Sequence, residues 1–236
     1  MNLHTASDGS SLVHQAVQAV RAHIRDNDLK AGDSLPGESH FAGNLGVSRA
    51  VMREAFGALA ALRQIDVANG RRARVAAIDG SVMAASLDHA VATAQISFAE
   101  VWDVRRTIEL RIVELAAVRR SPEQAARIVS LADAMADSGD DLPRLTALDI
   151  QFHQAIAEAS GNALFSQMVR SYAALMEVAV PQAWSTRQTD EQQVSTLERH
   201  QSLARAIADG DVAASVAGME AHFDRSIQDL VGDHLG

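Results

Sequence analysis

The segment GVSRAVMREA, residues 46–55, contains the signals that determine the fold of the N-terminal part of the chain. Gly46 is a typical residue for ending a helix, and Ser48 is typical of the position that caps the next helix. Pro36 can open the helix before this turn, and the apolar spacing of a helix continues after it to Leu62. We therefore predict two helices that meet at a tight turn. This is the arrangement of a helix-turn-helix, whose second helix enters the major groove of DNA.

The residues on both sides of this pair of helices extend the prediction. Apolar residues between Val13 and Ile24 recur at helical spacing, which indicates one more helix before the pair. After the pair, residues 65–67 and 73–75 alternate like short strands around the turn at 69–72, which contains two arginines. The sequence thus predicts a basic hairpin next to the helix-turn-helix, which is called a wing.

Two arginines of the second helix are the main candidates for contacts with DNA. Arg49 and Arg53 lie one turn apart on the same face, and the guanidinium group can form paired hydrogen bonds with guanine or with phosphate oxygens. A solvated helix face with two ordinary arginines is the alternative, and the glycine turn and the hairpin argue against it. The predicted DNA-binding residues are Ser48, Arg49, Arg53, Asn69, Gly70 and Arg71.

Composition and charge restrict the class of protein. The chain has 236 residues, no cysteine, 47% hydrophobic and 4% aromatic residues, which favours a mostly α-helical protein and excludes a disulfide scaffold. The net charge of −9 is unevenly distributed along the chain. Residues 1–78 contain nine Lys and Arg against seven Asp and Glu, whereas the later residues contain twelve Lys and Arg against twenty-three Asp and Glu. No apolar stretch approaches the length of a membrane span, and the first residues do not resemble a secretion signal, so we expect a cytoplasmic protein without membrane contact.

The change of charge coincides with a change of pattern, which predicts two domains. Residues 1–11 are expected to be disordered, 12–75 to form the winged helix-turn-helix, and 76–81 to be a linker. From 82 to 236 the apolar spacing is helical almost throughout, with predicted helices that include 145–159, 163–180, 194–208 and 212–230. We therefore predict a C-terminal all-α bundle of six to seven helices.

Four residues of this bundle have the chemistry of metal ligands. Asp149 and His153 lie four residues apart on one predicted helix, so their side chains are neighbours on one face. His200 and His222 lie on two later helices, where a bundle could turn them inward. Three imidazoles and one carboxylate suit Zn, Ni, Mn or Co. From spacing alone, ordinary surface or core residues remain the alternative.

These motifs together resemble a known family of proteins. The run 12–75 resembles the winged helix-turn-helix of GntR-type bacterial transcription regulators, most clearly at GVSR, residues 46–49, and at REA, residues 53–55. The region from about Phe98 to Val231 resembles the FCD-type effector domain of the FadR-like branch. The chain departs from the family at several positions, among them Ala31 in place of Pro, Arg63-Gln64 in place of Gly-Leu, and Arg72 in place of Gly.

The resemblance implies a homodimeric, DNA-binding regulator, most simply a repressor, that responds to a small organic acid. A two-fold symmetric dimer should bind a pseudo-palindromic operator. The resemblance also implies that Asp149, His153, His200 and His222 bind a divalent metal, with zinc as the first choice. Arg105, in the segment RRTIE at 105–109, would then bind the carboxylate of the effector beside the metal, although an ion pair with Glu109 is the alternative for this arginine.

Two other functions are compatible with these residues. A metal sensor would use the ion itself as the effector. A metal-dependent hydrolase could use open metal positions to activate water, but the sequence identifies no general base, and an enzyme would have no use for a DNA-reading domain. We therefore expect a regulator and not an enzyme.

Overall fold

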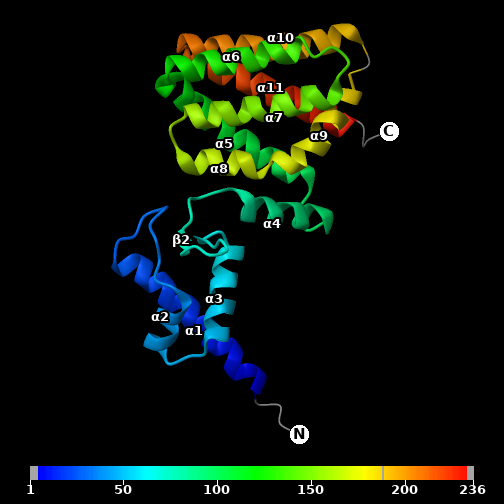
Figure 1. The fold of residues 1–236 in the computed structure, drawn as a ribbon. Coiled ribbons are helices and arrows are strands. Elements are labelled where there is room, and N and C mark those ends of the chain that lie inside the picture. The colour runs from blue at the N-terminus through cyan, green and yellow to red at the C-terminus, as the bar shows by residue number, and fades with distance from the viewer. Residues whose placement is uncertain (1–4, 188, 233–236) are drawn as a thin grey trace. The chain divides into compact units, whose positions relative to one another are not determined.

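The computed structural model describes the backbone of residues 5–187 and 189–232, and the surroundings of side chains within 12–187 and 189–224. Figure 1 shows the chain, which divides into two compact units, Met1–Val82 and Met83–Gly236. The prediction of a mostly α-helical protein with an N-terminal winged helix-turn-helix and a C-terminal helical bundle is confirmed.

The first unit contains three helices, α1 (Thr5–Asp26), α2 (Glu38–Leu45) and α3 (Arg49–Ala61), among its described residues. Residues 1–11 were expected to be disordered. Residues 1–4 of this segment lie outside the described residues, and α1 begins at Thr5. The turn between α2 and α3 has the chemistry that the sequence indicates. Gly46 has a left-handed φ of 67°, and the hydroxyl of Ser48 accepts a hydrogen bond of 3.2 Å from the backbone N–H of Val51.

The wing is a short antiparallel hairpin of β1 (Ile65–Asp66) and β2 (Arg74–Val75), in which Ile65 pairs with Val75. Both strands are one residue shorter than expected, and Val67, where the first strand was expected to continue, is 53% exposed. Ser34 adds an isolated bridge to Arg74, and Gly70 takes a φ of 72° in the turn. This φ favours glycine because it has no Cβ.

The core of the first unit joins the helices to the hairpin. α1 packs against α3, and Ile65 of β1 is buried in the same cluster as the apolar face of α3. Leu62, the last residue of the apolar spacing predicted for this helix, lies just after α3 and is 47% exposed, because the helix ends at Ala61. The buried cluster consists of Ala16, Val20, Leu35, Phe41, Ala42, Met52, Ala55, Phe56, Leu59, Ile65 and Ala73.

From Ser81 to Gly232 the described residues form eight helices. They are α4 (Ser81–Ala92), α5 (Phe98–Arg119), α6 (Pro122–Ala136), α7 (Leu142–Ala159), α8 (Ala163–Ser171), α9 (Ala173–Ser185), α10 (Asp190–Asp209) and α11 (Val212–Gly232). Local signals explain several of their starts. Ser97, Ser121 and Thr189 each cap a helix in a reciprocal capping box with the residue three positions later.

The expected number of six or seven helices in the bundle is corrected to eight in the described residues, for two reasons. The single helix predicted over 163–180 is divided at Tyr172 into α8 and α9, and Pro181 lies inside α9. Helix α4 was not predicted, because it buries none of its residues fully and its sequence lacks a clear apolar face. Neither feature leaves a strong local signal in the sequence.

Four helices of the second unit enclose its centre. α5 packs against α7, α10 and α11, and α6 and α10 lie side by side (Figure 1). The buried residues at this centre include Ile112, Phe152 and Phe223, together with several polar side chains that an ordinary apolar core would not contain. Among the described helices, none combines the length and apolar character that crossing a membrane requires.

Candidate metal centre, ligand cavity and DNA-binding face

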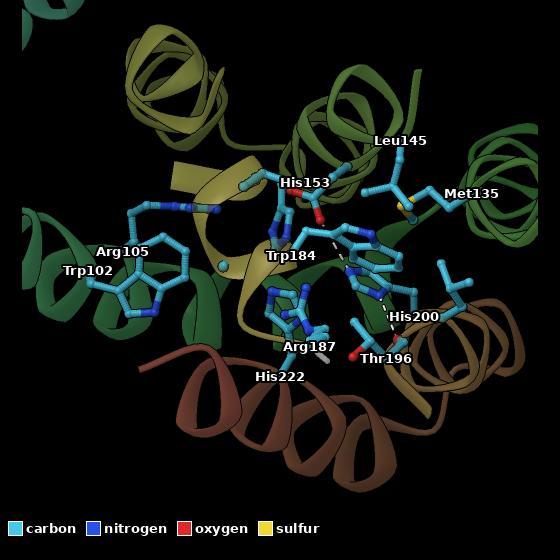
Figure 2. Close-up of a pocket in the computed structure, with 14 residues that line it drawn as sticks. Trp102, Arg105, Met135, Leu145, His153, Trp184, Arg187, Thr196, His200 and His222 are labelled. Carbon is cyan, nitrogen blue, oxygen red and sulfur yellow. Dashed lines mark hydrogen bonds and ion pairs between the residues drawn. The ribbon is translucent and has the colours of Figure 1, made fainter. Parts of the chain in front are cut away.

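The four predicted metal ligands come together inside the second unit. Asp149 and His153 lie one turn apart on α7, His200 lies on α10, and His222 lies on α11. Figure 2 shows the three histidines close together. One ligand atom from each of the three histidines lies within 4.8 Å of the others. Residues separated by up to 73 positions in the sequence thus face one small volume.

Hydrogen bonds fix how two of the histidines are oriented. Nδ1 of His153 contacts Oε2 of the buried Glu109, and Nδ1 of His200 donates to the backbone carbonyl of Thr196 at 2.9 Å. In metal sites, a ligating histidine almost always donates its other ring nitrogen to a carboxylate or a carbonyl. Both rings are therefore held with Nε2 directed away from these partners.

The Nε2 atoms of His153 and His200 are buried and make no hydrogen bond within the described residues. Nε2 of His200 lies 3.2 Å from Oδ1 of Asp149. Because Nδ1 of His200 carries the donated proton, a neutral ring directs a lone pair at a carboxylate oxygen, which is unfavourable unless a cation or a proton lies between them. The donor set of three imidazoles and one carboxylate therefore fits a divalent metal ion such as zinc.

Burial and neighbouring charges shift the protonation of these groups. Burial tends to raise the pKa of Asp149, but the close contact with His200 and the charges of the three histidines outweigh it, so that its pKa lies below the usual range. Burial, His200 and His153 hold the pKa of His222 well below 6.5. Both shifts favour the deprotonated forms, which are the forms that bind metals.

The lowered pKa of His222 predicts an acid-sensitive fold in the metal-free protein. In the unfolded chain His222 takes up a proton near pH 6.5, whereas in the folded protein it stays neutral at this pH. The contribution of His222 to stability is therefore fully present above about pH 6.5 and decreases as the pH falls below that value. We expect the free energy of unfolding to decrease by at most about 1.4 kcal/mol per pH unit from this group. Urea unfolding of the chelator-treated protein between pH 7.5 and 5.5 measures it. The His222→Gln variant should show a shallower slope, and equal slopes in both proteins would contradict the prediction.

The metal-ligand candidates line a cavity of about 30 Å³. Its remaining walls are mostly apolar and include Trp102 and Trp184 (Figure 2). Two arginines, Arg105 and Arg187, also line it. Its lining residues are Trp102, Arg105, Met135, Leu145, Asp149, His153, Val180, Ala183, Trp184, Arg187, Thr196, Leu197, His200 and His222.

The position of Arg105 is compatible with both of the interpretations that the sequence left open. It is 3% exposed, and its Nε donates to Oε1 of Glu109 at 2.8 Å, one helical turn further along α5. It also lines the cavity, where its Nη1 contacts the sulfur of Met176 and its guanidinium lies 4.9 Å from the centre of the Trp102 ring. The ion pair with Glu109 and a position beside the metal-ligand candidates are therefore compatible.

The sequence analysis missed two side chains of this site. Glu109 was considered only as a partner of Arg105, but it also contacts His153 across 44 residues of sequence. The position of Glu109, four residues after Arg105 on one helix, indicates the ion pair but gives no signal of the contact with His153. Arg187 follows the end of α9, and its guanidinium lies 5.2 Å from the centre of the Trp184 ring. No local pattern indicates that this arginine lines the cavity.

The predicted DNA-binding residues lie on the surface of the first unit. Arg49 and Arg53 are exposed at the start of α3, where Arg49 donates to Ser39 at 2.6 Å and Arg53 lies 3.9 Å from Glu38. Ser48 is exposed, and its hydroxyl caps α3. Asn69, Gly70 and Arg71 are exposed at the tip of the wing. The arginine side chains are therefore accessible to a DNA duplex.

Comparison with protein families accounts for both units. Residues 12–75 match the model of the bacterial regulatory proteins of the gntR family. Residues 100–225 match the model of the FCD domain. The second match includes all four metal-ligand candidates as well as Arg105 and Glu109.

Individual relatives are similar over most of their length. A putative L-lactate dehydrogenase operon regulatory protein from Escherichia coli is 30% identical over 89% of this chain and 83% of the relative. The HTH-type transcriptional regulator LutR of Bacillus subtilis is 25% identical over 90% of this chain and 97% of its own length. The galactonate operon transcriptional repressor of E. coli is 28% identical over 79% of this chain and 83% of the relative.

A solved structure supports the same fold. The Streptococcus agalactiae GntR protein superimposes with a TM-score of 0.63 over 90% of this chain and 97% of that protein, at 22% sequence identity. At this identity the likeness concerns the fold alone.

Proposed function

Because the chain belongs to the GntR family of bacterial regulatory proteins and carries an FCD domain, we propose that a small carboxylate effector, bound beside a divalent metal ion, controls its binding to DNA. The chain is a DNA-binding transcription regulator, like the other members of its family and its relatives, and it is not an enzyme. Two relatives are named as repressors or regulators of operons, and we propose repression here as well.

The observation that carries the proposal is the pair of buried Nε2 atoms, on His153 and His200, that lack a hydrogen-bond partner and face one cavity. With Asp149 and His222 these residues would hold the metal, with zinc as the first choice and nickel, manganese or cobalt as alternatives. When bound, the metal would supply a positive centre for the oxygen atoms of the effector.

The protein's own residues would orient the effector. Arg105 can bind a carboxylate through its guanidinium, and the apolar walls exclude competing water. The names of two relatives refer to L-lactate and galactonate, which makes these hydroxy acids the first probes to test.

Control of DNA binding would follow from linkage between two sites. An effector that prefers one arrangement of the DNA-binding units changes operator affinity by the ratio of its affinities for the two arrangements. We propose that the chain acts as a homodimer on a pseudo-palindromic operator, with the start of α3 in each half-site.

The test measures operator affinity with and without metal and acid. A duplex selected from a random pool by the wild-type protein serves as operator, and native mass spectrometry with elemental analysis gives the metal content and the oligomeric state. We expect a dimer with about one metal per chain. We expect L-lactate or galactonate to change operator affinity by about 5- to 150-fold, but only in the metal-loaded protein.

The other outcomes distinguish the alternatives. If chelation changes operator affinity with no acid present, the protein is a metal sensor and the ion is the effector. If neither metal nor acid alters operator affinity, the proposed effector control is wrong. A metal-free monomer would leave the four candidate ligands as ordinary helix residues.

A further inference from the structure

Glu109 is a carboxylate buried at the centre of the second unit, with an exposure of 1%. Its two oxygens are used by two different functional side chains. Oε1 accepts a hydrogen bond of 2.8 Å from Nε of Arg105, and Oε2 contacts Nδ1 of His153. One group therefore touches both the arginine of the cavity and a candidate metal ligand.

The surroundings of this group make its two contacts hard to replace. The guanidinium of Arg105 is enclosed by aromatic rings, 4.9 Å from the centre of Trp102 and 5.5 Å from the centre of Phe223. His153 is 3% exposed and packs at 5.0 Å from the ring of His222. In such an enclosed volume, a lost partner is not readily replaced by solvent.

We propose that Glu109 is a positioning residue that holds His153 protonated at Nδ1 and fixes Arg105 at the cavity wall, so that metal binding and carboxylate binding depend on the same side chain. The proposal rests on the metal centre and effector cavity of the proposed function. It gives Glu109 of α5 a role in orienting His153 of α7, which lies 44 positions later in the sequence.

The physical reason lies in the two ring nitrogens of His153. A ring that donates Nδ1–H to a carboxylate keeps a lone pair on Nε2, and this pair is what a metal requires. Without the carboxylate, the ring can place its proton on Nε2 or rotate. The same change would release Nε of Arg105 and allow its guanidinium to leave the cavity wall.

The first experiment measures zinc affinity by competition with a chromophoric chelator. Glu109→Gln keeps the shape of the side chain and removes its charge, and it should lower zinc affinity by about 10- to 100-fold. Glu114→Gln is the matched control, since Glu114 lies on the same helix in an exposed pair with Arg111, and its zinc affinity should equal that of the wild type. A folded Glu109→Gln protein with wild-type zinc affinity would overturn the proposal.

The second experiment reads the tautomer directly and needs no bound metal. Nitrogen NMR of protein labelled at histidine should show His153 protonated at Nδ1 in the metal-free wild type and a mixture of tautomers in Glu109→Gln. Protonation at Nε2 in the wild type would overturn the proposal even if the variant does not fold. If the wild type shows the Nδ1 tautomer but binds no zinc, the metal centre fails while the positioning of His153 by Glu109 stands.

Discussion

The double variant His153→Ala and His200→Ala should lose its bound metal, from about one ion per chain to the background of the buffer. Both residues direct a buried Nε2 without a hydrogen-bond partner at the same cavity. Their loss leaves Asp149 and His222, and two ligands from two helices are too few for a site of the usual four. Elemental analysis after exhaustive dialysis against metal-free buffer measures the loss.

A matched control separates loss of the site from loss of histidine as such. His40 and His89 are exposed and lie outside the cavity, so the double variant His40→Ala and His89→Ala should retain its metal. Circular dichroism checks that the variants fold, and His222→Ala is the substitute if the first double variant does not. Stoichiometric metal in a folded His153→Ala and His200→Ala protein would show that the ligands lie elsewhere.

The parts of the fold that the sequence predicts well are those set by local chemistry. The turn at Gly46 and Ser48 needs only a residue that tolerates positive φ and a side chain that caps a helix, and both are visible in the sequence. The division at Tyr172 has no such signal, because the residues on both sides continue an apolar pattern without glycine or proline at the break. The packing of the helices in the bundle determines where this helix is divided.

The same contrast holds for the candidate site. Asp149 and His153 are neighbours through the period of one helix, so their spacing alone suggested a pair. That His200 and His222 meet them came from the resemblance to a family, since no periodicity relates residues on α7, α10 and α11. The second contact of Glu109 could not be predicted at all, because it depends on how α5 is placed against α7.

The double variant Arg49→Ala and Arg53→Ala should lose most of its affinity for the operator. Each arginine is expected to contribute about 1 to 3 kcal/mol if it contacts a base. The two lie one turn apart on the exposed start of α3, and the side chain of Arg53 is 79% exposed, so both can reach one groove. If the two contacts contribute independently, the double variant should lose about 2 to 6 kcal/mol, and a smaller loss would show that these neighbouring arginines are coupled.

Fluorescence anisotropy with the selected duplex at several salt concentrations measures this loss and identifies its origin. Removing an arginine that binds phosphate should weaken binding to all DNA sequences equally and reduce the slope of log affinity against log salt concentration by about one. Removing an arginine that contacts a base should relax the specificity at the position of that base. Arg63→Ala is the matched control, because Arg63 is exposed just past the other end of α3, about 20 Å away, and pairs with Asp79. If the double variant binds the operator as tightly as the Arg63→Ala protein does, α3 is not the helix that reads DNA.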